Sequence, residues 1–136
     1  MKLILLILFI PFASGPIRYK QLTWTDFKGI PTSDHLASTC SGIVIEKDTA
    51  YAVFEPDKSW TRTNSVATLR HEQLHFDITD RFAKQISMRL KTKNWLNLDG
   101  WVDDWEEMET RYDKETDHGN DAEAQARWER EIKSKL

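Results

Sequence analysis

The sequence has 136 residues, of which 19 are basic and 22 are acidic, and its one cysteine is Cys40. A formal net charge of −3 lacks the basic excess that phosphate binding requires, so we expect no nucleic-acid partner. A single cysteine excludes an internal disulfide and a cysteine-based metal cluster. We expect Cys40 to be a small apolar residue, buried or half-buried.

The first 15 residues predict a cleaved signal peptide. Met1-Lys2 gives a positive start, Leu3–Phe12 is almost wholly apolar, and Ala13-Ser14-Gly15 offers the small residues of a signal-peptidase site. The apolar run is short for a membrane span, and an uncleaved anchor is the alternative. We therefore expect an exported protein whose single domain covers residues 16–136 and is free of the membrane after cleavage.

Residues 16–40 combine extended and turn patterns. Ile17-Arg18-Tyr19 alternates as a short strand does. Leu22–Gly29 indicates a tight turn in which Trp24 and Phe27 fill the core, and loop composition follows it.

Residues 41–56 predict a β-hairpin. The apolar runs Ile43–Ile45 and Tyr51–Phe54 are joined by a short polar turn. Pro56 ends the second strand and indicates that this strand lies at a sheet edge. The hairpin is either purely structural or an edge to which an extended substrate adds beside the next helix.

The longest helical pattern starts near Asn64 or Ser65, which are both good N-cap residues, and runs without Gly or Pro to about Thr92. A helix that is apolar on several sides is buried on several sides, so we expect this to be the central helix. Its apolar residues form one i, i+4 stripe and a second group elsewhere on the surface, namely Leu74, Ile78, Phe82, Ile86 and Leu90, and then Val66, Leu69 and Phe76.

This helix contains the run His71-Glu72-Gln73-Leu74-His75, which has the form H-E-x-x-H. Residues i and i+4 lie on one face of a helix, so His71 and His75 can bind one metal ion. Glu72 projects about 100° away and can reach a water molecule on that metal. Zinc suits a site with two imidazole ligands and an open position for water. The H-E-x-x-H pattern occurs by chance in roughly one chain of this length in a few hundred.

A loop is predicted over Asn94–Gly100, because Asp99-Gly100 is a strong helix break. The next helix is expected from Trp101 to about Thr116, and His118-Gly119 marks its end. We expect its aromatic stripe to lie in the core rather than to form a shelf for substrate.

A last helix is capped by Asn120 or Asp121. The sequence therefore predicts an α+β fold in which a small antiparallel sheet is followed by three helices. The apolar stripes of the last two helices are Trp101, Trp105, Met108 and Tyr112, and then Ala124, Trp128, Ile132 and Leu136.

A catalytic zinc site needs three protein ligands and a water. His118 lies in the turn between the last two helices, from which a side chain can point back at the H-E-x-x-H helix, and we expect it to be the third ligand. A carboxylate is the alternative, and Asp113 is the best of the acids because it directly follows a member of the apolar stripe. The other candidates are Glu109 and Asp117, whereas His35 is expected to be solvated.

Four blocks of the sequence occur in order: LTWTDFKG at residues 22–29, HEQLHFDI at 71–78, YDKETDHG at 112–119 and QARW at 125–128. In these blocks the chain resembles a family of bacterial secreted zinc-dependent proteases that is catalogued as a domain of unknown function. The resemblance spans essentially the whole mature chain. It implies a zincin-like metallopeptidase fold, a secreted or periplasmic location, zinc ligation by His71 and His75, and the catalytic-acid role for Glu72.

These features predict a zinc-dependent hydrolase that acts on peptides or proteins, and we expect it to be a monomer. Zinc lowers the pKa of its water and polarises the scissile carbonyl, while Glu72 takes the water proton and passes it to the leaving amine. Tyr112 is a candidate donor to the tetrahedral intermediate, with core packing as its alternative. Asp77 either orients a ligand imidazole or is a solvated helix acid.

Two other functions remain open from the sequence. One is a zinc amidase that acts on cell-wall peptide links with the same three residues. The other is a catalytically inactive binding module in which zinc only stabilises the helices, and such a module has no need of Glu72.

Overall fold

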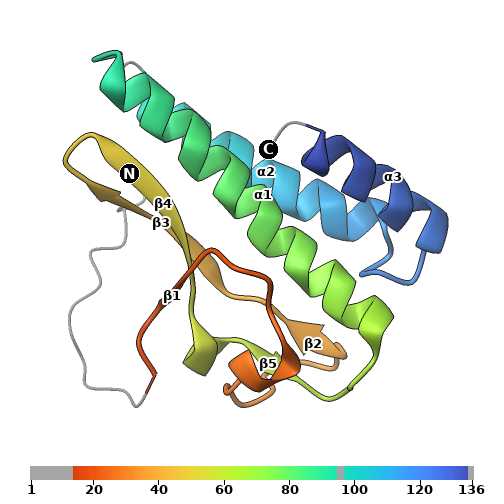
Figure 1. The fold of residues 1–136 in the computed structure, drawn as a ribbon. Helices are drawn as coiled ribbons and strands as arrows, with labels where there is room; N and C mark the ends of the chain where they lie inside the picture. Colours follow the sequence, from red (N-terminus) through yellow and green to blue (C-terminus); the bar gives the residue numbers. More distant parts are fainter. Residues whose placement is uncertain (1–13, 95–96, 135–136) are drawn as a thin grey trace.

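The computed structural model describes residues 14–94 and 97–134 of the chain. The fold is α+β, with small antiparallel sheets first and three helices after them, as the sequence predicts (Figure 1). Among the described residues, no helix is long and apolar enough to cross a membrane. Of the predicted signal peptide, residues 1–13 lie outside the described residues. Leu136 of the last apolar stripe also lies outside them.

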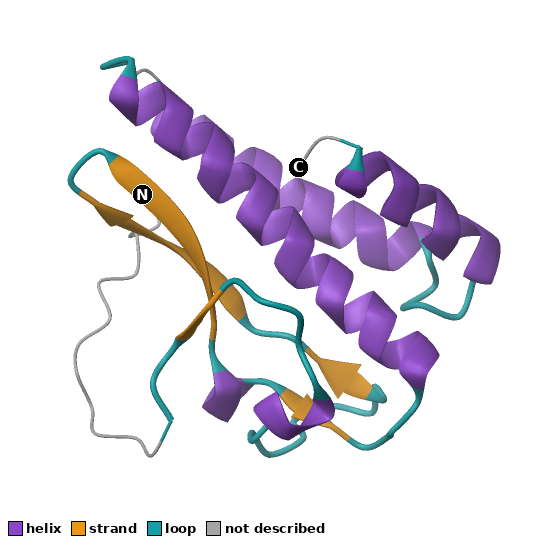
Figure 2. Ribbon diagram, in the orientation of Figure 1, coloured by secondary structure: helices purple, strands orange, loops and turns teal. Residues whose placement is uncertain are grey.

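The β part consists of a three-stranded and a two-stranded antiparallel sheet (Figure 2). The larger sheet has the order β1-β4-β3, and in the smaller one β2 pairs with β5. The strands are β1 (Ile17–Arg18), β2 (Ala37–Ser38), β3 (Ser41–Glu46), β4 (Thr49–Phe54) and β5 (Trp60–Thr61).

β3 and β4 form the predicted hairpin, in which Ile43 lies opposite Ala52. The expectation that Pro56 marks an edge strand is wrong, because β4 is the middle strand of its sheet. Pro56 lies beyond the last paired residue and begins a short 3-10 helix, so its missing N–H removes no sheet hydrogen bond. Cys40, just before β3, is a free and half-buried cysteine, as expected.

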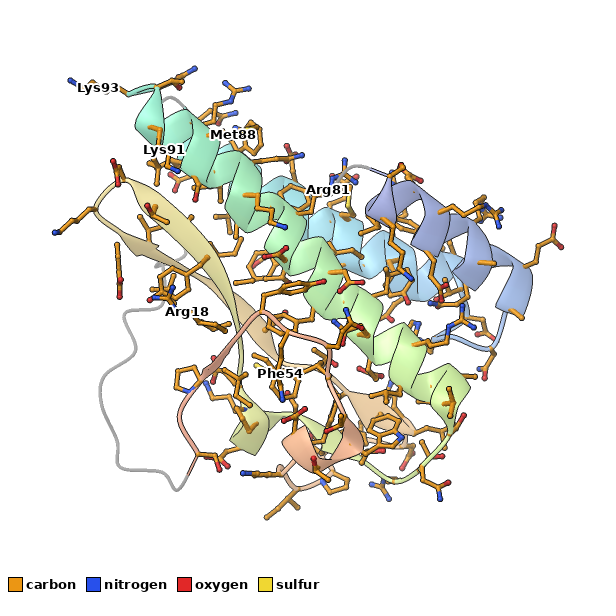
Figure 3. The ribbon with its side chains drawn as sticks, viewed as in Figure 1. Arg18, Phe54, Arg81, Met88, Lys91 and Lys93 are labelled. Carbon is orange, nitrogen blue, oxygen red and sulfur yellow. The ribbon has the colours of Figure 1, made fainter. Side chains whose placement is uncertain are left out.

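α1 (Val66–Lys91) is the central helix, and the Ser65 hydroxyl caps it by accepting a hydrogen bond from the Thr68 N–H. One side of α1 packs on the sheet and another side packs on α2 and α3 (Figure 1). Phe54, labelled in Figure 3, is fully buried between α1 and the sheet. The buried core on the sheet side also contains Leu22, Phe27, Phe76, Ile86 and Leu90, whereas the core on the helix side contains Leu74, Ile78, Phe82, Tyr112, Trp128 and Ile132.

α2 (Leu98–Glu115) begins earlier than expected, so the predicted break at Asp99-Gly100 is wrong. Asn97 precedes the helix in a left-handed conformation with φ 64°. The chain therefore turns at Asn97 rather than at Asp99-Gly100. Gly100 falls in the first turn, where the backbone N–H groups have no partner within the helix, and a glycine there does not end it. α3 (Ala122–Lys133) starts as predicted, because Asp121 accepts a hydrogen bond from the Ala124 N–H.

Candidate metal centre

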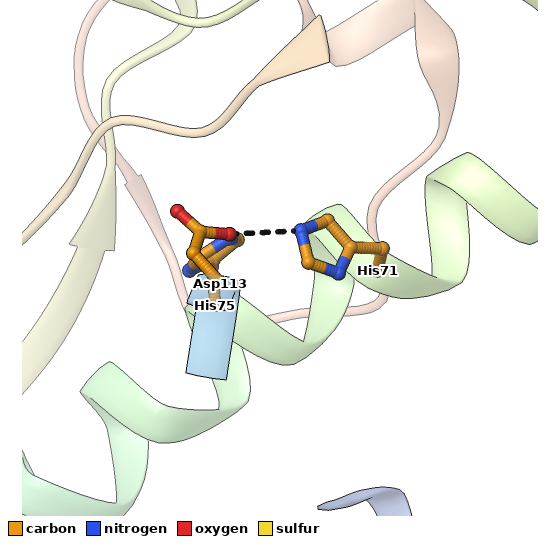
Figure 4. A group of neighbouring side chains, drawn as sticks. All are labelled: His71, His75 and Asp113. Atoms are coloured by element: carbon orange, nitrogen blue, oxygen red, sulfur yellow. Dashed lines mark hydrogen bonds and ion pairs between the residues drawn. The ribbon is translucent and has the colours of Figure 1, made fainter. Parts of the chain in front are cut away.

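Three side chains from α1 and α2 converge at one point (Figure 4). The Nε2 atoms of His71 and His75 lie 3.1 and 2.9 Å from Oδ1 of Asp113. These three candidate ligand atoms all lie within 4.8 Å of one another. The i, i+4 spacing brings the two imidazoles together on α1, and Asp113 meets them from α2 because it directly follows the buried Tyr112.

Hydrogen bonds on the far side of each imidazole ring fix its orientation. Nδ1 of His71 lies 3.1 Å from Oε1 of Gln125, and Nδ1 of His75 contacts the Glu109 carboxylate. The Gln125 amide nitrogen donates to Glu129, which leaves its carbonyl oxygen facing His71. Each Nδ1 therefore carries a proton, and in a neutral imidazole the Nε2 lone pair then points into the cluster.

The cluster of His71, His75 and Asp113 could hold a cation, because in neutral imidazoles two Nε2 lone pairs would face the Asp113 carboxylate. Burial favours a neutral His75, but the nearby carboxylates outweigh burial and hold the pKa of His75 well above its ordinary value. Burial also opposes ionisation of Asp113, yet the two adjacent histidines outweigh burial and lower its pKa. A proton on His75 satisfies the arrangement, and so does a divalent metal ion that takes two nitrogens and one oxygen as ligands.

Glu72 is buried beside this cluster, with 4% of its surface exposed, and lines the same cavity as the candidate ligands. The Thr39 hydroxyl lies 2.7 Å from its Oε2 and holds the carboxylate in place. Glu72 is outside the group of three that can share one metal. No pattern in the sequence identifies Thr39, because the two residues are 33 positions apart in the chain.

The cavity has a volume of about 380 Å³, which is within the range of ligand pockets. Residues 34–39, which include β2, form its second wall. The Leu36 carbonyl accepts a hydrogen bond from the Arg62 N–H, so Leu36 faces β5. Backbone groups of alternate residues point to opposite sides of an antiparallel strand. Those of Ala37 therefore point to the other edge of β2, which pairs with no strand among the described residues.

His118, which we expected to be the third ligand, lies at the cavity rim and outside the cluster. Its side chain is 51% exposed, and its Nδ1 is 3.7 Å from Oδ1 of Asp113. The structure instead brings the alternative ligand, Asp113, to both histidines of α1. The cause is the backbone of residues 117–119, which is left-handed at all three positions and packs Gly119, not His118, against His71.

Tyr112, a candidate donor to the tetrahedral intermediate, belongs to the core, which was the alternative that the sequence offered. Its side chain is 0% exposed, and its hydroxyl lies 3.0 Å from the His71 carbonyl oxygen and 2.7 Å from Oε1 of Gln125. Its ring stacks on the His71 ring, with 4.7 Å between the centroids. The Tyr112 hydroxyl is therefore engaged inside the core, and its ring supports the His71 ring.

Asp77 does not orient a ligand imidazole. It is buried and accepts hydrogen bonds from the Tyr19 hydroxyl and the Gln73 amide, each at 2.9 Å. The orienting groups are Glu109, which the sequence offered only as a ligand, and Gln125, which it did not identify. A signal for Gln125 exists, because it opens the last of the four blocks and directly follows a residue of the α3 stripe.

Comparison of the chain with family models, with curated proteins and with solved structures finds no match. The resemblance to secreted zinc-dependent proteases therefore stays a prediction from the four sequence blocks.

Proposed function

We propose that the protein is a secreted zinc-dependent peptide hydrolase with a zincin-like H-E-x-x-H helix. The observation that supports it is the cluster, in which two Nε2 atoms and the Asp113 carboxylate meet with Glu72 buried beside them in an open cavity. His71, His75 and Asp113 would hold the metal, and two nitrogens with one carboxylate oxygen suit zinc.

Bound zinc would supply a water of lowered pKa and a charge that polarises the scissile carbonyl. Glu72 accepts a proton from the attacking water and later transfers it to the leaving amine. Thr39 donates to one carboxylate oxygen of Glu72, Oε2, and so leaves Oε1 for the water. Glu109 and Gln125 keep both ligand imidazoles in the tautomer that exposes Nε2.

An extended peptide suits the second wall of the cavity. The backbone groups of Ala37 face the edge of β2 that pairs with no described strand, where an added strand can pair with them. The strand that lines the cavity is β2, whereas the sequence offered the β3–β4 hairpin either as a substrate-binding edge or as a purely structural element. We propose a peptide or protein substrate outside the cytoplasm and a monomeric enzyme.

Metal analysis tests the ligand set. The purified mature protein should contain one zinc per chain, and His71→Ala, His75→Ala and Asp113→Asn should each lose stoichiometric zinc, because each removes a ligand. Asp117→Asn, on the exposed turn after α2, is the matched control and should keep the metal. A full zinc equivalent in both histidine variants would refute the site.

Glu72→Gln tests the reaction. It should keep zinc and lower peptide hydrolysis by about 10²–10⁴-fold, because the general base is lost. Glu107→Gln, an exposed glutamate on α2, should cleave like the wild type. The assay uses a broad peptide library together with cell-wall peptides, so that cleavage of the cell-wall links alone would identify the amidase. Normal turnover by Glu72→Gln would assign proton transfer to another residue.

Export is tested by sequencing the N-terminus of the protein made in its native host. A mature start between about residues 14 and 20 agrees with a cleaved signal peptide. An intact Met1 on cytoplasmic protein would contradict the proposed location.

A further inference from the structure

Peptide hydrolysis places a negative charge on the carbonyl oxygen of the tetrahedral intermediate, and a positioned N–H or O–H donor stabilises it. The Tyr112 hydroxyl is engaged in the core. The Thr39 hydroxyl is occupied by Glu72. The cavity wall also contains His118, whose ring is half exposed and lies next to the candidate ligand Asp113.

We infer that His118 is a catalytic residue that donates an imidazole N–H to the oxyanion of the intermediate. The inference rests on the proposed peptide hydrolysis and extends it by one residue. Nδ1 of His118 is 3.7 Å from Oδ1 of Asp113, the atom on which both ligand histidines converge. It is therefore close to the reacting centre, yet it is not one of the three groups that can share the metal.

The turn between α2 and α3 holds His118 in this position. Asp117 and His118 have φ of 48° and 53°, left-handed values that non-glycine residues seldom adopt. Backbone hydrogen bonds maintain them, because the His118 N–H donates to the Asp113 carbonyl and the Asp121 N–H donates to the carbonyl of the buried Thr116. A conformation that is unfavourable and firmly held is common where a side chain must be aimed.

The imidazole ring of His118 is also held from the opposite wall. Its centroid lies 4.5 Å from that of His35, which is exposed, as the sequence predicted, and also contacts His118. His35 and Thr39 belong to the same wall segment, residues 34–39, and contact His118 and Glu72 respectively. A substrate carbonyl at the candidate ligands would therefore have the base towards one end of this segment and the donor towards the other.

The chemistry balances with His118 as a hydrogen-bond donor alone. The water oxygen forms a bond to the carbonyl carbon, its proton goes to Glu72, and the carbonyl π pair moves onto the oxygen. The N–H of His118 stabilises that oxygen without transferring its proton. The pair on the oxyanion then re-forms the carbonyl π bond as the carbon–nitrogen bond breaks. The pair of that broken bond leaves with nitrogen, and Glu72 returns the proton to the amine.

The test compares wild type, His118→Ala, His118→Gln and His35→Ala as zinc-loaded mature proteins. Zinc content, kcat, KM and the dissociation constant of a phosphinic peptide, which imitates the tetrahedral intermediate, are measured for each. His118→Ala should keep one zinc and a wild-type circular dichroism spectrum. Its kcat should fall about 10²–10³-fold with little change in KM, and its phosphinic peptide affinity should fall in parallel. His118→Gln retains an N–H donor and should recover part of the lost kcat and of the lost phosphinic peptide affinity. His35→Ala should lose less kcat and less affinity than either His118 variant.

The outcomes separate the alternatives. Loss of zinc from His118→Ala would make His118 a ligand and overturn the inference, and so would a wild-type kcat with wild-type phosphinic peptide affinity. Wild-type protein that cleaves no peptide and does not bind the phosphinic peptide would refute the peptide-hydrolase proposal itself, and this role with it. If the wild type cleaves peptides and His118→Ala cleaves them equally fast, the oxyanion role of His118 alone would be refuted.

Discussion

Gly119 lies against a candidate ligand, and its replacement by alanine gives a sharp test of the packing around His71. A Cβ atom at this position would lie 2.8 Å from Cγ, 2.9 Å from Cβ and 3.1 Å from Nδ1 of His71. The residue also has φ of 85°, where a side chain is strained whatever the space. The sequence identified this glycine only as a helix end.

Two terms set the magnitude for Gly119→Ala. The left-handed conformation costs an L-residue about 1–2 kcal/mol. Overpacking a filled site costs about 1–3 kcal/mol, because the His71 ring is stacked on Tyr112 and cannot withdraw freely. The free energy of unfolding should therefore fall by about 2–5 kcal/mol, a large share of a typical domain's stability. A displaced ring also weakens the Nδ1 hydrogen bond to Gln125, so zinc affinity should fall about 10–100-fold.

Urea denaturation in the presence of a chelator measures the first effect, and competition with a chromogenic chelator measures zinc affinity. The control is Gly42→Ala in β3, where an added Cβ would meet its nearest neighbour, the Val53 side chain, at an ordinary 3.9 Å. A Gly119→Ala protein whose free energy of unfolding is within about 0.5 kcal/mol of the wild type, and which binds zinc normally, would refute close packing of Gly119 against His71.

Three further predictions concern hydrogen bonds of buried groups. Gln125→Leu removes the acceptor at Nδ1 of His71, so zinc affinity, measured by chelator competition, should fall about 10–100-fold while Gln125→Glu keeps most of it. Ser87→Ala leaves the buried backbone N–H and carbonyl of Ala50 without their side-chain partner, and urea denaturation should show a loss of about 1–3 kcal/mol; an unchanged midpoint would contradict this. Burial opposes ionisation of Asp26, but hydrogen bonds from a lysine ammonium and a backbone N–H lower its pKa. The ionised Asp26 carboxylate therefore adds to the free energy of unfolding above its unfolded-state pKa of about 4, and this contribution is lost as pH falls through its pKa in the folded state. Asp26→Asn should therefore flatten the acid side of a plot of the free energy of unfolding against pH.

The sequence by itself determined the parts of the site whose causes are local. The pair His71 and His75 follows from i, i+4 geometry, and the Ser65 cap and the unbroken apolar pattern determine the helix that carries them. The same helix is apolar on several sides, which predicted its central place between the sheet and the other two helices. Alternation and turn composition likewise predicted the hairpin of β3 and β4.

Only the tertiary structure decided how the rest of the site is completed. Asp113 and His118 are five residues apart, and which of them reaches the histidines depends on how α2 packs against α1 and on the left-handed turn after it. Thr39, Glu109 and Gln125 contact their partners across 33, 34 and 54 residues of chain. Contacts of this kind are fixed by the packing of whole elements against one another, and no periodicity within a single element encodes them.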